Sequence, residues 1–282
     1  MSFSIENHIL SSEKHKITDW TKETAKKNSK TYRQSGGELD TLIMHYTGGR
    51  SGESSAKYLI RPEVKASAHI VIDKSGEVFQ LVPFNKVAWH AGVSSYGLRS
   101  GFNKYSIGIE MDNAGVLTKV GNEFQAWFGV RYPENEVLQA THRNESSPRY
   151  WHTYTPELIE VAQEIAELLV KEYKLNSILG HEEISPGRKQ DPGPAFELDK
   201  FRDMILTGRD VDETIISDNL PSSGVVAVDK LNIRSGSSTS FDKVAKPLSR
   251  GLSVEILEEK DGWVKVKTSV TGWVKKDFVT TK

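Results

Sequence analysis

Cysteine is absent from all 282 residues, which excludes a disulfide framework, a thiolate nucleophile and thiolate metal ligands. The sequence also lacks any apolar run near the ~20 residues that a membrane-spanning helix needs. An excess of one charge is missing too, because 37 basic residues stand against 38 acidic ones, a formal net charge of -1. We therefore expect no membrane partner and no nucleic-acid partner. Any metal ion must be held by His, Asp or Glu.

A secretory signal is a further absence. Residues 1–10 include a glutamate and several polar side chains, without the apolar segment of about 7–15 residues that such a signal contains. We therefore expect synthesis in the cytoplasm without a Sec signal.

The length suggests about two domains, on a prior of roughly 100–200 residues per domain. Residues 222–282 carry a net charge of +4, whereas the rest of the chain carries −5, and a polar, turn-rich stretch lies between them. We place an N-terminal domain at 1–210, a linker at 211–222 and a C-terminal domain at 223–282. Five short strand-like segments without helical periodicity predict a small closed β-barrel for the C-terminal domain.

The N-terminal domain mixes two periodicities. Apolar runs of strand length lie at residues 41–46, 68–72, 106–111 and 177–180, and residues 73–76 predict a hairpin turn. The clearest helix begins at Thr155 and Pro156 and ends near Lys174, with apolar residues at a 3.6-residue period. A second helix is predicted at 197–206. The pattern predicts an α/β domain with a mixed central β-sheet flanked by helices.

Residues 117–152 differ from the rest, because they are polar and aromatic without a clean period. So long a connection inside a domain is usually functional or has minor structure of its own. Two interpretations stay open for its aromatic side chains: a small hydrophobic core, or a lip that faces a substrate.

Two histidines follow strand-like runs: His45, at the end of an apolar run, and His181, directly after another. Asp191 comes ten residues after His181, in a loop rich in proline and glycine. Two imidazoles and one carboxylate form a reasonable catalytic zinc set with a fourth position for water. The alternative is a pair of hydrogen-bonded histidines and a turn-capping aspartate, and spacing alone favours that alternative.

Four motifs resemble the zinc-dependent N-acetylmuramoyl-L-alanine amidases of type 2, a family that includes AmpD-like recycling enzymes, phage endolysins and peptidoglycan recognition proteins. The motifs occur in the family's order at residues 45–49 (HYTGG), 88–92 (AWHAG), 106–110 (SIGIE) and 180–194, which ends in PGRKQDPGP. The C-terminal segments at 231–236, 261–264 and 272–274 are similar to bacterial SH3-type domains that accompany cell-wall hydrolases.

The resemblance implies one Zn²⁺ per catalytic domain, with His45, His181 and Asp191 as its ligands. It implies further that Glu110 is the catalytic glutamate and Lys189 the catalytic lysine. Such a site polarises an amide carbonyl and stabilises a tetrahedral oxyanion, while the glutamate moves a proton from water to the leaving amine. Zinc and lysine favour an ionised Glu110, whereas partial burial opposes ionisation.

Three more residues are candidates for substrate binding. Trp89 and His90 belong to the second motif, where Trp89 could offer its face to a muramyl sugar or stem peptide. Arg188 could meet a stem-peptide carboxylate through its planar guanidinium group, although a surface ion pair would explain it equally well. His69 is expected to be a packed, neutral imidazole or a support for the site.

The implied function is hydrolysis of the amide between N-acetylmuramic acid and L-alanine of peptidoglycan. We expect a cell-wall lytic enzyme whose C-terminal barrel binds the wall. Two alternatives stay open: a cytosolic recycling amidase acting on soluble anhydromuramyl peptides, and a non-catalytic peptidoglycan receptor. Action at the wall would follow holin-type release or delivery by a secretion system.

Overall fold

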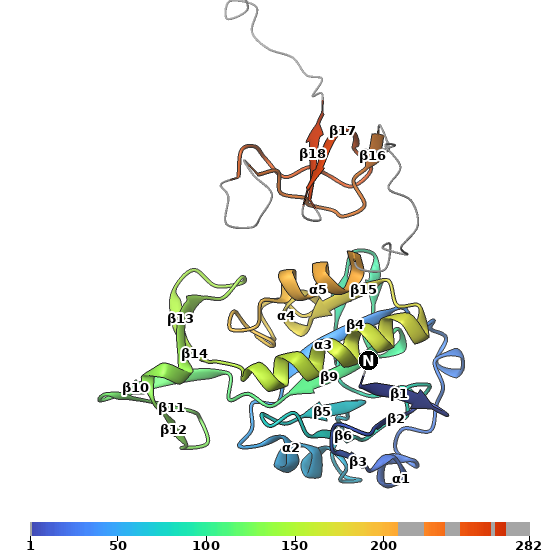
Figure 1. Ribbon diagram of the computed structural model, residues 1–282, viewed down its shortest axis with the longest axis vertical. Helices are drawn as coiled ribbons and strands as arrows, with labels where there is room; N and C mark the ends of the chain where they lie inside the picture. Colours follow the sequence, from blue (N-terminus) through green and yellow to red (C-terminus); the bar gives the residue numbers. More distant parts are fainter. Residues whose placement is uncertain (1, 208–222, 235–242, 261–262, 269–282) are drawn as a thin grey trace, which may run out of the picture. The chain divides into compact units, whose positions relative to one another are not determined.

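The computed structural model describes residues 2–207, 223–234, 243–260 and 263–268. The chain divides into two units, Met1–Asp210 and Val211–Lys282. All helices among the described residues belong to the first unit, and the second contains a small β-sheet (Figure 1). The linker predicted at 211–222 lies outside the described residues.

A six-stranded sheet forms the centre of the first unit (Figure 1). Neighbouring strands are β15 (Ser177–Gly180), β4 (Thr41–Tyr46), β9 (Ser106–Met111), β5 (Ile70–Ile72), β6 (Val78–Gln80) and β3 (Ile17–Asp19), in that order. The first four are parallel, whereas β5 and β6 pair antiparallel across the predicted turn at 73–76. The predicted class, a mixed central sheet flanked by helices, is confirmed.

The helix α3, Pro156–Tyr173, packs on this sheet where the sequence predicts it. It begins at Thr155, whose side-chain oxygen accepts a hydrogen bond of 3.3 Å from the N–H of Leu158. It ends at Lys174, which adopts a left-handed conformation with φ 53°. One face of α3 is buried in the core through Leu158, Val161, Ala162, Ile165, Ala166, Leu169 and Val170.

Shorter elements complete the first unit. Its other helices are α1 (Thr21–Thr24), α2 (Gly52–Leu59), α4 (His181–Ile184) and α5 (Leu198–Thr207), with 3-10 turns at Arg33–Ser35, Phe102–Lys104 and Glu134–Glu136. Two hairpins pair β1 (Phe3–Glu6) with β2 (Ile9–Ser12) and β7 (Ser95–Tyr96) with β8 (Arg99–Ser100). The predicted helix at 197–206 corresponds to α5, which shares the core of α3.

The two faces of the central sheet differ in chemistry, because successive strand residues point to opposite sides. Leu42 and Met44 of β4, with Ile107 and Ile109 of β9, belong to the core beneath α3. The intervening residues of β4 are Ile43, which packs in a separate small cluster, and His45. The apolar face fixes the strands, and the polar side chains of the candidate site lie on the other face.

Between β9 and α3 the chain forms a second, antiparallel sheet of five strands, which we call the inserted sheet (Figure 1). Its order is β12 (Arg131–Tyr132), β11 (Glu123–Gln125), β10 (Val116–Val120), β14 (Pro148–His152) and β13 (Val137–Thr141). Its own hydrophobic cluster contains Ala114, Leu117, Phe124, Ala126 and Tyr132. The small core that the aromatic residues suggested is therefore present.

The described part of the second unit contains a three-stranded antiparallel sheet. β16 (Ser223–Val225) pairs with β17 (Ser253–Lys260), and β17 pairs with β18 (Trp263–Lys267). Isolated bridges join Leu231 to Leu248 and Arg234 to Lys243. The segment at 272–274, which is similar to bacterial SH3-type domains, lies outside the described residues.

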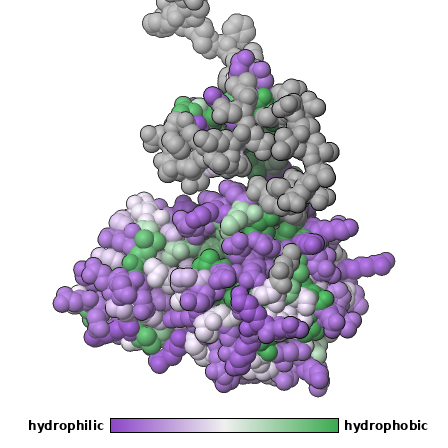
Figure 2. All heavy atoms as spheres, in the orientation of Figure 1, coloured by the Kyte–Doolittle hydropathy of each residue, from purple (hydrophilic) through white to green (hydrophobic). Residues whose placement is uncertain are grey.

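Hydrophilic side chains cover most of the face of the first unit seen in Figure 2, and hydrophobic ones form small separate patches. The large apolar side chains have gathered in the core beneath α3 instead. In the described portion of the chain, no helix combines the length and apolar character required to cross a bilayer.

Candidate active site

His45 and His181 come from neighbouring parallel strands of the central sheet. His45 is the fifth residue of β4 and is 1% exposed. His181 follows β15 directly and begins the one-turn helix α4, at 3% exposure. Because β4 and β15 are in register as far as Met44 and Gly180, both imidazoles leave the same edge of the sheet.

Asp191 reaches these histidines from the loop after α4. Its Oδ2 atom lies 2.9 Å from Nδ1 of His45 and 2.9 Å from Nδ1 of His181, and the two Nδ1 atoms are also 2.9 Å apart. Burial alone would raise the pKa of Asp191, but its interactions with His181 and His45 reverse this and lower the pKa. The structure thus brings together the three residues predicted as metal ligands.

The hydrogen bonds on the far side of each ring determine which nitrogen carries the proton. Nε2 of His181 lies 3.1 Å from the carbonyl oxygen of Ala91, which can only accept, so Nε2 donates. His90 donates from Nε2 to the carbonyl oxygen of Ser106 at 3.3 Å, which leaves its Nδ1 to accept from Nε2 of His45 at 3.0 Å. In the neutral rings, both Nδ1 atoms therefore direct lone pairs toward Oδ2 of Asp191.

Three acceptor atoms that converge in this way could hold a metal ion. Imidazole nitrogen and carboxylate oxygen are ligands that zinc prefers, and the second nitrogen of a ligating histidine usually donates to a supporting group. Burial, together with the neighbouring His181, lowers the pKa of His45 to about 4, so this ring stays neutral and able to bind a metal ion. The residues present fit a Zn²⁺ ion.

His90, predicted to contact substrate, is 8% exposed and has both ring nitrogens engaged by His45 and Ser106. Its ring lies against β9 because residue 108 is glycine: a Cβ there would stand 2.4 Å from Cγ of His90. The glycine of the SIGIE motif therefore has a packing role. His90 supports His45, and burial holds its pKa well below the usual range.

His69 is a packed, neutral imidazole. It is fully buried, and burial lowers its pKa to about 4. Its Nδ1 accepts from the N–H of Gly108 at 3.0 Å, and its Nε2 donates to the carbonyl oxygen of Lys86 at 2.9 Å. With both nitrogens used in this way, His69 supports β9 and takes no part in the cluster around Asp191.

Glu110 lies beside His45, since the two residues are register partners on β9 and β4. Its Oε2 atom is shielded from solvent and has no hydrogen-bond partner among the described residues. Burial, followed by the charge of Asp191, raises its pKa well above the usual value, and the charge of Lys189 opposes this. A carboxyl group held in this way is suited to accept and return a proton.

Lys189 and Arg188 lie in the same loop as Asp191 and line the groove. The Nη2 atom of Arg188 donates to the carbonyl oxygens of Ala91 and Val93, at 3.1 and 2.7 Å, and to the Ser185 hydroxyl at 2.7 Å. This part of the guanidinium group therefore fixes the loop. Lys189 has its positive charge close enough to influence both Glu110 and His45.

The site opens into a groove of about 1010 Å³, at the upper end of the usual range for ligand pockets. Its lining includes Glu110, Lys189 and Asp191 together with the aromatic residues Tyr46, Tyr58, Trp89, Trp127 and Phe128. Trp89, predicted to bind substrate, is 39% exposed and lies on this surface. Trp127 and Phe128 come from the inserted sheet, so that sheet also forms a lip of the groove.

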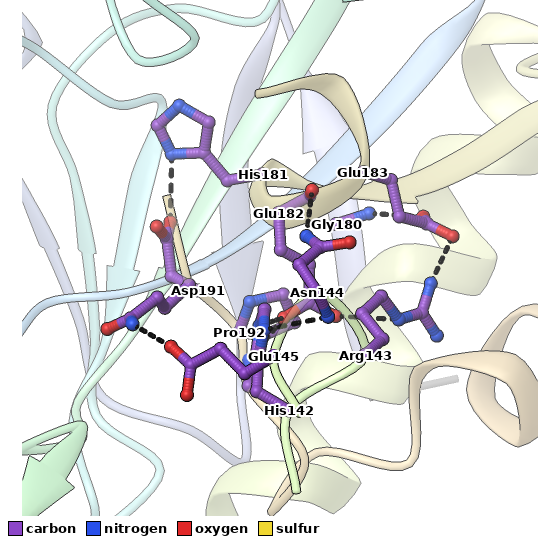
Figure 3. A network of polar contacts seen from close by, with 12 residues as sticks. His142, Arg143, Asn144, Glu145, Gly180, His181, Glu182, Glu183, Asp191 and Pro192 are labelled. Carbon is purple, nitrogen blue, oxygen red and sulfur yellow. Dashed lines mark hydrogen bonds and ion pairs between the residues drawn. The ribbon is translucent and has the colours of Figure 1, made fainter. Parts of the chain in front are cut away.

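A polar network that the sequence did not indicate joins the inserted sheet to the loop that contains Asp191 (Figure 3). His142, in the turn between β13 and β14, contacts Glu182 through Nε2 and Oε2 at 2.5 Å, and both side chains are buried. The N–H of Glu182 donates to the carbonyl oxygen of Asp191 at 2.8 Å, and its Oε2 accepts from the N–H of Gly193 at 3.2 Å. Glu182 thereby holds the backbone on both sides of Pro192.

The turn between β13 and β14 makes further contacts with α4 and with the loop that contains Asp191 (Figure 3). Arg143 pairs with Glu182 at 3.1 Å and also with Glu183. The Asn144 amide donates to the carbonyl oxygen of Glu182 at 2.9 Å, and Gln190, next to Asp191, donates to Glu145. Forty residues separate His142 from Glu182, so no local motif could have revealed this pair.

The fold and site define a class of protein that the family comparison names. A model described as N-acetylmuramoyl-L-alanine amidase matches residues 35–194, more than half of the chain, and the chain belongs to this family. A second model, described as bacterial SH3 domain, matches residues 229–280. Both assignments agree with the resemblance that the sequence motifs indicated.

Among curated proteins, the chain is 34% identical over 142 residues to the 1,6-anhydro-N-acetylmuramyl-L-alanine amidase AmpD of Escherichia coli, covering 50% of this chain and 60% of AmpD. It is 27% identical over 167 residues to the N-acetylmuramoyl-L-alanine amidase AmiD of the same organism, covering 56% of this chain and 50% of AmiD. The chain thus spans about half to three-fifths of the length of these relatives.

Among solved structures, a selenomethionine derivative of AmpD aligns with a TM-score of 0.48 at 24% identity, over 72% of this chain and 99% of that one. AmiD from E. coli, in complex with anhydro-N-acetylmuramic acid-L-Ala-D-gamma-Glu-L-Lys, aligns with a TM-score of 0.44 at 22% identity. That match covers 71% of this chain and 64% of AmiD.

Proposed function

We propose that this protein is a zinc-dependent amidase that hydrolyses the bond between N-acetylmuramic acid and L-alanine in peptidoglycan. The observation that carries this proposal is the convergence of His45, His181 and Asp191 beside the partnerless carboxylate oxygen of Glu110, within a domain of the amidase family. The curated relatives AmpD and AmiD, named as muramyl-L-alanine amidases, support the same substrate bond.

Metal binding, proton transfer and stabilisation of the oxyanion are assigned to different residues of the groove. His45, His181 and Asp191 would hold a Zn²⁺ ion, which would supply a Lewis acid and lower the pKa of water to about 7. Glu110 accepts the proton of the attacking water and returns it to the leaving amine of L-alanine. Lys189 lies in the same groove and provides positive charge where the amide oxygen becomes an oxyanion.

The alternative of a non-catalytic peptidoglycan receptor is less well supported. A receptor needs a groove but has no use for a buried metal site with a carboxylate next to it. Here the three candidate ligands lie together, and two of them, His181 and Asp191, line the same cavity as Glu110 and Lys189. This complete set favours an enzyme over a receptor.

The physical form of the substrate is a finer question, and we propose polymeric peptidoglycan. The match of residues 229–280 to the bacterial SH3 domain supports a wall-binding unit, and the net charge of +4 on residues 222–282 suits an anionic polymer. Tethering such a binder to the catalytic unit raises its effective concentration at the wall. Action at the wall would follow holin-type release or delivery by a secretion system.

Zinc content and product analysis test the proposed chemistry. Purified protein incubated with sacculi should contain one zinc per chain and release new L-alanine N-termini. Cleavage should cease on chelation and return when zinc is added. Zinc without cleavage of sacculi or of soluble anhydromuramyl peptides would contradict the amidase proposal, and wall binding without zinc would favour the receptor.

Removal of the second unit tests the choice of polymer. A chain ending at Asp210 should lose sacculus hydrolysis by about a hundredfold, because it loses the tether. Turnover of a soluble anhydromuramyl peptide should stay within about twofold of the full chain. Equal activities of both chains on sacculi would show that the second unit does not target the wall.

A further inference from the structure

Trp127 combines a fixed position with an exposed ring. It lies in the turn between β11 and β12 and is 82% exposed. Its indole N–H donates a 2.8 Å hydrogen bond to the carbonyl oxygen of Gly48, in the loop that follows His45 on β4. The polar edge of the indole is thus occupied, whereas its apolar faces remain open.

Neighbouring side chains hold this turn in place. Phe128 meets the Trp127 ring edge-on, with ring centroids 5.6 Å apart at 81°. Arg50 donates from Nη2 to the carbonyl oxygen of Phe128 at 3.0 Å, and its guanidinium carbon lies 5.9 Å from the centre of the Phe128 ring. Gly48 and Arg50 belong to the loop that follows β4. The side chains of Trp127 and Arg50 therefore attach the turn at Trp127 and Phe128 to the central sheet.

Two cavities meet at Trp127. The first is the groove of about 1010 Å³ that contains Glu110 and Lys189, and the second has a volume of about 630 Å³. Both are lined by Trp127, and they also share Tyr46, Gly48 and Gln190. The binding surface therefore continues past Trp127, beyond the space where the amide bond would lie.

The second cavity suits a neutral, hydroxyl-rich ligand. Its lining includes the polar side chains of Thr118, Gln125 and Gln190. Gln125 and Gln190 each donate one hydrogen bond from Nε2 to the protein, to the carbonyl oxygen of Gly129 and to Glu145, and each amide still has a second N–H and its oxygen to offer. Its cationic residue, Arg149, is already paired with Glu145 at 3.1 Å, so a peptide carboxylate would have to compete for it. An exposed indole face next to neutral hydrogen-bonding groups favours a sugar ring over a stem peptide.

We propose that Trp127 is the platform of a saccharide subsite, and that the second cavity takes the sugar residue next to the muramyl unit whose amide is cut. This inference rests on the proposed amidase function, because it assumes that the first groove holds the muramyl–L-alanine bond. It makes Trp127 a specificity-determining residue that favours glycan chains over substrates with a single sugar.

The test compares W127A with L138A, a control on the same inserted sheet. Leu138 is an exposed apolar residue, at 37%, that lines neither cavity. Two probes are hydrolysed: solubilised glycan chains that carry stem peptides, and muramyl dipeptide, which has one sugar. For W127A, the ratio of kcat/KM on chains to kcat/KM on muramyl dipeptide should fall about tenfold, and L138A should leave this ratio unchanged.

A third variant separates the two functions of the indole. W127F keeps a ring face but loses the hydrogen bond to Gly48, so it should recover part of the ratio. An unchanged ratio for W127A would overturn the proposal. So would an equal loss on both substrates, because it would mean that Trp127 only positions the loop after His45.

Binding of peptide-free glycan strands provides a readout that needs no amide hydrolysis. The metal-loaded wild-type chain should bind these strands about tenfold more tightly than W127A. If the wild-type chain hydrolyses neither probe, the proposed function fails, whereas this difference in binding would still support the subsite. Equal binding by both chains would contradict the subsite whether or not the enzyme cuts.

Discussion

The central sheet and the inserted sheet contribute to the groove in different ways. In the central sheet, β4 and β9 are nearly all buried. His45 and Glu110 lie near the ends of these strands, and His181 directly follows β15. In the inserted sheet most strands are partly exposed, and its contributions, Trp127 and His142, come from turns. The comparison indicates that His45 and Glu110, which need exact placement, lie on buried strands of the central sheet. Trp127, which we propose binds a sugar, and His142, which supports the loop of Asp191, lie on turns of the inserted sheet.

The largest expected effect comes from removing a ligand of the central sheet. His181→Ala should abolish zinc binding and lower turnover by roughly a thousandfold or more, since two ligands cannot maintain the open zinc site. Metal analysis after dialysis, together with amide hydrolysis, measures both. His8→Ala, at a turn outside the groove, is the control for loss of an imidazole. Full zinc content in the His181 variant would remove this residue from the ligand set.

The next effect separates proton transfer from metal binding. Glu110→Gln keeps the shape of the side chain but cannot accept the proton of water, so turnover should fall by about 10²–10⁴. Zinc content should not change. The free energy of unfolding at pH 8 should hold or rise, because a buried group that resists ionisation becomes neutral. Turnover close to wild type would exclude Glu110 as the general base.

The support given by the inserted sheet should produce a smaller effect. His142→Ala leaves the buried carboxylate of Glu182 without one partner, and Glu182 holds the backbone around Asp191. Zinc affinity, measured by competition with a chelator, should fall about 10- to 100-fold, and the unfolding free energy by about 2–3 kcal/mol.

Two variants make the His142 prediction specific. Thr141→Ala, at an exposed position that ends β13 and precedes His142, should change neither zinc affinity nor stability. His142→Gln retains an N–H donor and should restore part of the affinity. A loss of stability in His142→Ala without any change in zinc affinity would mean that the inserted sheet does not support the loop that contains Asp191.

The last effect is on stability alone, and it is a pH dependence to which both sheets contribute. His69 in the central region and His152 in the inserted sheet are buried, and burial lowers the pKa of each to about 4. In the unfolded chain these groups titrate near 6.5, so between pH 6.5 and 4 the unfolded state binds more protons. The unfolding free energy should therefore have its full value above pH 6.5 and decrease as the pH falls toward 4.

Denaturant unfolding at a series of pH values measures the two contributions. His69→Gln should flatten the slope between pH 6.5 and 4 by up to about 3 kcal/mol in total. His152→Gln should flatten it by a similar amount, because burial and the charge of Lys74 lower the pKa of His152 to the same value of about 4. Slopes equal to that of the wild type would mean that neither histidine resists protonation in the folded state.

The sequence predicted the central architecture well, because burial leaves a periodic signal. The run at 41–46 became β4, the run at 106–111 became β9, and the helix from Thr155 became α3, each with apolar residues at the spacing of its element. The ligand candidates followed from motif order, and the structure brings them within 2.9 Å of one another. Their roles in catalysis stay predictions.

The sequence did not predict the inserted sheet, because its strands leave no periodic signal of burial. Its strands are short and partly exposed on both faces, so residues 117–152 show no alternation strong enough to predict five strands. The contacts of His90 and Arg188 within the fold were also out of reach, and their predicted roles in substrate binding stay predictions. Nδ1 of His90 contacts Nε2 of His45, and Nη2 of Arg188 donates to the carbonyl oxygen of Val93, and both partners are distant in the sequence.

The sequence by itself determined the type of domain, the family and the identity of the candidate ligands, since periodic burial and local motifs are properties of neighbouring residues. Tertiary structure alone decided which imidazole nitrogen faces the cluster, that Glu182 is held by His142, and that Trp127 borders two cavities. These features depend on contacts between residues far apart in the sequence, such as Ala91 with His181 and His142 with Glu182, and only the folded chain brings such residues together.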